Sequence, residues 1–307
     1  MMELKKISKV LIAVTFSSCV VFSSCKKDET NIVSTDPATI AAATDATESI
    51  ATTEAQFDDV FNITMGVQSS DAGEDIGIET GVDVIYQTNV DSDGAILIQT
   101  PASPRCFTVS VIPRAIHEFP KTITIDFGSG CTGKDGKVRK GKIISIYTGP
   151  MFIPGSKCST SFEDYFVDSF KIEGQNTIEN TSATNEKEWK VTVTDGKITN
   201  MHSGAWEMWN STKTHRQVEG NGTPRYPLDD IFHITGSTVA TASNGNRWEA
   251  LIVDPLVKKI GCHWITKGNI EISKNNIKAK LDYGDGTCDN EATITINGVS
   301  YNITLHK

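Results

Sequence analysis

The sequence predicts an all-β protein: an antiparallel β-sandwich or barrel-like meander of about a dozen strands with an internal duplication, preceded by a short helix and a flexible N-terminal tether. Two observations carry most of this prediction. From Gly81 onward, apolar and polar residues alternate with a period of two, as in strands with one buried face. Asn-Gly and Asp-Gly dipeptides, which favour tight hairpin turns, stand between several of these runs.

A motif that occurs twice indicates the duplication. Residues 125–131 and 281–288 each combine a strand-like run, an Asp, an aromatic residue, a Gly-rich turn and a cysteine. A second cysteine lies about two dozen residues upstream of each copy, which is a loop length that a disulfide can close. We therefore expect two copies of one strand-and-turn unit near the start and the end of the β region.

The chain opens like an export signal. Lysines precede an apolar run at residues 10–22, which is too short to span a bilayer as a stable helix. The run ends in Phe-Ser-Ser-Cys at 22–25, and Lys-Lys-Asp-Glu follows at 26–29. These residues resemble a bacterial lipobox, in which residues 1–24 form the signal peptide and Cys25 becomes the diacylated first residue. Cys19 has a similar context, but it lies inside the apolar run.

The start of the mature chain further resembles outer-membrane lipoproteins of the Bacteroidetes type, in which a lysine and acidic residues after the cysteine accompany export to the cell surface. The resemblance covers only these opening residues. It implies a membrane partner through the lipid at Cys25 and an outer-membrane, surface-facing location. The alternative is an ordinary cleaved secretory signal.

A tether and a helix are expected before the strands. Residues 25–53 are rich in Thr, Ser, Ala and Asp, which suits a flexible stalk. Phe57, Val60, Phe61 and Met65 then cluster at helical spacing, and Gly66 is a natural stop. We predict a short amphipathic helix packed on the sheet, with residues 54–307 forming one elongated domain. A division near residue 220 is the alternative.

The strands expected in order follow from the alternating runs. They lie at residues 82–86, 96–98, 107–111, 123–127, 141–147, 166–174, 189–194, 197–209, 231–241, 246–253, 277–283, 292–296 and 299–305. Asp195-Gly196, Asn244-Gly245 and Asn297-Gly298 are expected to form the turns that join neighbouring runs.

An exported chain meets an oxidising compartment, so disulfides are the default interpretation of its cysteines. Sequence alone allows many pairings. The duplicated motif favours Cys106 with Cys131 and Cys262 with Cys288, which leaves Cys158 over. We expect no metal site at these cysteines, because the sequence has no CxxC pair and adjacent strand residues point to opposite faces.

Composition and motifs exclude several functions. The formal net charge is −9 without a basic stripe, which argues against nucleic acid as a partner. No HExxH, Ser-His-Asp or GxSxG pattern surrounds the six histidines, and we expect no cofactor. Residues 91–94 resemble the opening of a calcium loop but lack its later ligands, so a hairpin turn is favoured. Asp282, Asp285 and Asp289 form a further acidic cluster.

Two groups of residues are functional candidates. Asp126 and Asp282 are either catalytic carboxylates or caps that bind the backbone of their Gly turns, and the second is favoured. Trp206 and Trp209 lie in the densest aromatic patch, and in a strand they face opposite sides. One is expected in the core, and the other would be a platform for a glycan or protein ligand.

The sequence therefore favours a lipid-anchored, exported, non-catalytic binding or structural module of the bacterial outer membrane. The alternative is a cell-surface hydrolase of polysaccharide or peptide that uses Asp126 or Asp282. A glycosidase would need two carboxyl groups facing each other in one cleft, about 5–10 Å apart.

Overall fold

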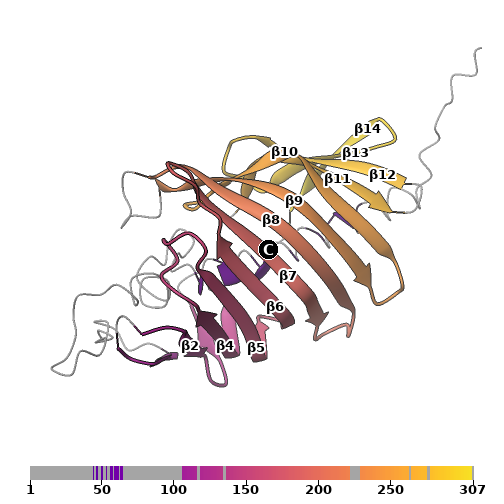
Figure 1. Ribbon diagram of the computed structural model, residues 1–307. Coiled ribbons are helices and arrows are strands. Elements are labelled where there is room, and N and C mark those ends of the chain that lie inside the picture. The colour runs from indigo at the N-terminus through magenta and orange to yellow at the C-terminus, as the bar shows by residue number, and fades with distance from the viewer. Residues whose placement is uncertain are drawn as a thin grey trace, which may run out of the picture. The chain divides into compact units, whose positions relative to one another are not determined.

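The computed structural model describes residues 106–305, apart from 116–117, 134–135, 222–228, 263 and 275–276, together with single positions between 44 and 64. Fourteen antiparallel strands form one sheet, which confirms the predicted all-β class. Neighbours in the sheet follow the chain, as the progression of colour in Figure 1 shows: β1-β2-β4 and onward to β14, with β3 pairing beside β4. The sheet is therefore a meander.

Strand lengths rise toward the middle of the sheet and fall again toward its C-terminal end. The strands are β1 (Thr108–Ile112), β2 (Lys121–Asp126), β3 (Cys131–Thr132), β4 (Val138–Tyr147), β5 (Lys157–Val167), β6 (Phe170–Asn180), β7 (Lys187–Asn200), β8 (Trp206–Glu219), β9 (Ile231–Ala242), β10 (Arg247–Lys259), β11 (Ile265–Lys274), β12 (Ile277–Asp285), β13 (Glu291–Ile296) and β14 (Val299–Thr304).

The period-two pattern of the sequence is the burial pattern of the strands. In β13, for example, Ala292, Ile294 and Ile296 are buried, while the residues between them reach solvent in part. The buried residues of successive strands join into one hydrophobic core. This alternation gives the sheet an inner face, which carries the core, and an outer face, which is mixed and polar.

A helical segment covers part of the inner face. Every described residue between 44 and 64 is helical, and Phe57, Val60 and Phe61 are buried as predicted. The Phe57 ring meets the ring of Trp209 on β8 at a centroid distance of 4.4 Å. Among the described residues, no helix is long and apolar enough to cross a membrane.

The helical segment begins earlier than the sequence suggested. Residues 25–53 were expected to form a flexible tether, yet Ala46, Ile50 and Thr53 are helical and buried. Their spacing of three to four residues continues the stripe of Phe57 toward the N-terminus. Small and polar residues dilute this stripe, so it reads as a linker when hydrophobicity alone is considered. Met65 and Gly66 lie outside the described residues.

Two of the three dipeptide turns are confirmed and one is wrong. Asn297-Gly298 joins β13 to β14, with positive φ at both positions, and Asn244-Gly245 lies in the turn between β9 and β10. Asp195-Gly196 instead lies inside β7, where the register against β8 shifts between Val193 and Gly196. The dipeptide forms a bulge there, because its positive φ suits a bulge as well as a hairpin.

The strand boundaries differ from expectation at two further turns. The run at 166–174 was expected to be one strand, but the turn at Asp168-Ser169 divides it between β5 and β6. The run at 197–209 is likewise divided by residues 201–205. In both cases the alternation continues on either side of a short polar turn, so the pattern alone does not reveal the interruption. The runs at 82–86 and 96–98 lie outside the described residues.

Both predicted disulfides are present. Cys106 pairs with Cys131 across 25 residues, and Cys262 pairs with Cys288 across 26 residues. Cys158 is a free thiol buried in the core, and burial raises its pKa to about 11. The sheet also continues past residue 220, because β8 and β9 pair along most of their length.

Candidate functional site

The two candidate tryptophans lie on opposite faces of β8, as the alternation predicted. Trp209 is 2% exposed and packs under Phe57 of the helical segment. Trp206 lies on the outer face and is partly exposed. A ligand in solvent can therefore reach Trp206, whereas the structure makes Trp209 a core residue and contradicts a stacking role for it.

A small surface surrounds Trp206. The Nζ atom of Lys197 on β7 lies 5.6 Å from the centre of the indole ring, and Thr199 is the cross-strand neighbour of Trp206. Met208, two residues along β8 and therefore on the same face, is 41% exposed. Lys197, Thr199, Trp206 and Met208 form what we call the Trp206 patch. It offers an aromatic face, a thioether, a hydroxyl and an ammonium group to one ligand.

Asp126 and Asp282 both hold their own turns. The backbone N–H of Gly128 donates to Asp126 Oδ1 at 2.8 Å, and the N–H of Gly284 donates to Asp282 Oδ1 at 2.9 Å. This confirms that each aspartate caps its Gly turn. The two residues lie on β2 and β12, which are not neighbours in the sheet. The structure thus gives no sign of the facing carboxyl pair that a glycosidase needs.

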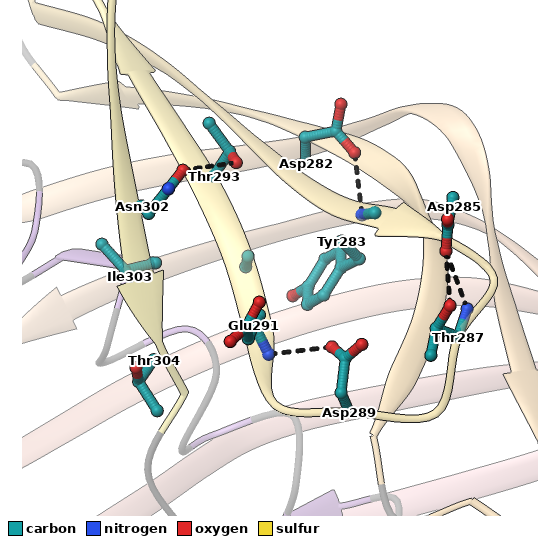
Figure 2. A pocket seen from close by; sticks show the side chains of 12 residues that line it. Asp282, Tyr283, Asp285, Thr287, Asp289, Glu291, Thr293, Asn302, Ile303 and Thr304 are labelled. Carbon is teal, nitrogen blue, oxygen red and sulfur yellow. Dashed lines mark hydrogen bonds between the residues drawn. The ribbon is translucent and has the colours of Figure 1, made fainter.

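A surface pocket of about 470 Å³ lies at the ends of β12, β13 and β14, and Figure 2 shows it from close by. Acidic side chains line much of it: Asp282, Asp285, Asp289 and Glu291. Thr293 and Asn302 contribute neutral polar groups from the two last strands, and the Thr293 hydroxyl donates to Asn302 Oδ1 at 3.3 Å. The acidic cluster noticed in the sequence is therefore gathered around one pocket.

The acids of this pocket bind local backbone. Asp285 Oδ1 accepts hydrogen bonds from the hydroxyl and the N–H of Thr287, at 2.7 and 3.0 Å, and these bonds lower its pKa. Asp289 Oδ1 accepts the N–H of Glu291 at 3.0 Å. Among the residues that the structure describes, no group of three or more His, Cys, Asp or Glu is placed to hold a metal ion. The hydrogen bonds explain the cluster as the scaffold of a turn.

The inner face of β8 carries ionisable residues that sequence motifs did not reveal. His215 stacks on Phe61 at a centroid distance of 4.7 Å, and burial together with nearby Lys213 lowers its pKa to about 3. Burial lowers the pKa of Lys213 to about 7 and raises that of Glu207 to about 7. The phase of Trp209 was the available signal, because these residues lie an even number of positions from it.

An ion pair fixes the helical segment to the sheet. Arg139 of β4 donates from Nε and Nη2 to the two carboxylate oxygens of Asp59, at 3.1 and 2.7 Å, and Lys137 Nζ lies 3.2 Å from Oδ1. Burial alone would raise the pKa of Asp59, but the two cations outweigh it and the pKa lies below its ordinary value. This contact positions the helix and has no opening to a pocket that we identify.

Cys25 and residues 91–94 lie outside the described residues. The chain matches no family model, and it has no significant match among curated proteins or solved structures.

Proposed function

We propose that this chain is a lipid-anchored, exported binding module of the bacterial outer membrane, and that it is not a catalyst. Its anchor would be the diacylated Cys25, after removal of residues 1–24. The two disulfides support the compartment, since such bonds persist in oxidising environments. The sheet and its covering helix would act as a rigid scaffold for a ligand-binding surface.

The observation that carries the binding role is the Trp206 patch. Trp206 is held on a long central strand, with neighbours on both sides, and it still reaches solvent. A partly exposed tryptophan buries a large apolar area when a sugar ring or an apolar side chain stacks on it. Lys197 adds a donor beside the ring at 5.6 Å. These features fit a glycan or a protein segment as the ligand.

The pocket beside Asp282 is where the hydrolase alternative would act, because four carboxyl groups meet there. Three of them accept hydrogen bonds from the backbone of their own turns. A carboxylate that accepts such bonds is stabilised in its charged form and is a poor general acid at neutral pH. This chemistry supports the binding role over the hydrolytic one.

The proposal predicts that Trp206→Ala lowers ligand binding while stability stays nearly unchanged, because the side chain lies outside the core. Cells displaying the full chain would be probed with labelled polysaccharides and peptide libraries, and retained label would be measured by flow cytometry. Phe152→Ala is the matched control, since Phe152 is an aromatic residue that is 58% exposed elsewhere on the surface. Cys25→Ser should release the protein from the membrane and abolish the cell-associated signal.

Three results would count against the proposal. Binding that survives Trp206→Ala, or falls equally in Phe152→Ala, would remove the patch from the ligand site. Unchanged membrane attachment in Cys25→Ser would remove the anchor. Turnover of any probe that disappears in Asp282→Asn, with the circular dichroism spectrum preserved, would establish the hydrolase instead.

A further inference from the structure

The last strand of the sheet has an open edge. Within the described part of the chain, β14 has one neighbour, β13, and the sheet path ends there. Its sequence, Val-Ser-Tyr-Asn-Ile-Thr, contains no charged residue and no proline. Sheet edges are usually protected by lysine, proline or a bulge, because their unpaired backbone groups can bind another strand. These protections are missing along β14.

The outward backbone groups of β14 can be identified from the register. Ile296 and Val299 flank the two-residue turn, and such flanking residues exchange backbone hydrogen bonds. The pattern then alternates along the ladder, so Ser300, Asn302 and Thr304 direct their N–H and C=O groups away from β13. The side-chain contact between Thr295 and Ser300 at 2.9 Å agrees, because side chains approach most closely at pairs without backbone bonds.

This edge is complementary to itself. If two copies meet antiparallel about Asn302, the outward groups of Asn302 face those of the second Asn302. Ser300 of each copy then faces Thr304 of the other. Tyr301 falls opposite Ile303, and both belong to the margin of the hydrophobic core on the inner face. Each outward N–H and C=O group thereby gains a partner without a change in the fold.

The charges near the edge favour the same arrangement. Exposed Lys278 and Lys280 lie beside the Val299 end of β14, two strands away, whereas Glu291 is the cross-strand neighbour of Thr304 at the other end. An antiparallel encounter brings the basic end of one copy beside the acidic end of the other. Charges at this separation steer association and its orientation at low ionic strength.

We propose that two copies of this chain associate through β14, as an antiparallel, two-fold symmetric pair that continues the sheet from one molecule into the next. The inference is independent of the Trp206 patch and of the ligand it binds. A six-residue strand pair is smaller than the usual stable interface, so the pair is a weak, concentration-dependent one. The geometry is isologous and closes at two copies.

A cysteine at the two-fold axis tests the proposal in the full chain. In Asn302→Cys, the two new cysteines would have Cα atoms about 5.5 Å apart, which is within the range of a disulfide. Mild oxidation should therefore give a covalent dimer on a non-reducing gel. Thr293→Cys is the matched control: Thr293 lies beside Asn302 on β13, so its two copies would be about 14 Å apart and should not crosslink.

A second variant tests the backbone bonds. In Asn302→Pro the lost N–H points away from β13, so the strand can keep its place in the sheet. Sedimentation velocity over a concentration series should show reversible dimer for the unmodified chain and loss of that dimer in Asn302→Pro. Equal crosslinking of both cysteine variants, a monomer at every concentration, dimer that persists in Asn302→Pro, or growth into larger assemblies would each overturn the proposal.

Discussion

Lys213 shows how strongly one buried residue can couple stability to pH. It lies in phase with the buried residues of β8, and burial lowers its pKa from 10.5 to about 7. Between these two pH values the unfolded chain binds a proton that the folded protein does not, so stability rises as pH increases through this window. The residue keeps some solvent exposure, which makes the full effect an upper limit.

We predict that Lys213→Met stabilises the protein near pH 7 and flattens its stability above that pH. The removed slope is at most about 1.4 kcal/mol per pH unit for one proton. Urea unfolding from neutral to alkaline pH measures it. Lys190→Met on the outer face is the control and should keep the original slope. An identical pH dependence in all three proteins would show that Lys213 is solvated in the fold.

The helical segment depends on one buried ion pair for its place on the sheet. Asp59→Ala would leave Arg139, whose side chain is 3% exposed, without its carboxylate partner. We predict a loss of roughly 3–5 kcal/mol in unfolding free energy. Asp59→Leu combined with Arg139→Met should recover much of it, because no buried charge remains.

An exposed ion pair supplies the comparison. Glu163→Ala removes the partner of Lys142, where the carboxylate side chain is 57% exposed, and should cost less than about 1 kcal/mol. Denaturant titration of the three variants measures all of these differences. A cost for Asp59→Ala as small as that of Glu163→Ala would mean that the helix contributes little to the stability of the sheet.

The elements that the sequence predicted well are those whose signal is local. Alternation located the strands, and Asn297-Gly298 located a hairpin, because both depend on a few consecutive residues. Asp195-Gly196 misled because the same backbone conformation serves a turn or a bulge, and the partner strand β8 decides between them. The turn-capping role of Asp282 was local and predictable. The pocket around it was not, since Asn302 reaches it from a different strand.

At the scale of the whole molecule, the two disulfides lie far apart in the strand order, one beside β3 and one beside β12. We predict that Cys106→Ala with Cys131→Ala, and Cys262→Ala with Cys288→Ala, each lower the unfolding free energy by about 3 kcal/mol. Distant sites usually act additively, so removing both should cost the sum. Chemical denaturation measures this, and a strong departure from additivity would show that the two ends of the sheet are coupled.

The meander also has a consequence for how the protein is made. Past β4, each strand pairs with the strand that precedes it along the chain. The sheet can therefore grow in the direction of synthesis or translocation, one hairpin at a time, without waiting for a distant segment. Each disulfide likewise joins cysteines only 25 or 26 residues apart, so the first can be oxidised while most later strands have yet to emerge. Throughout assembly the newest strand is the growing end of the sheet, and β14 is where that growth stops.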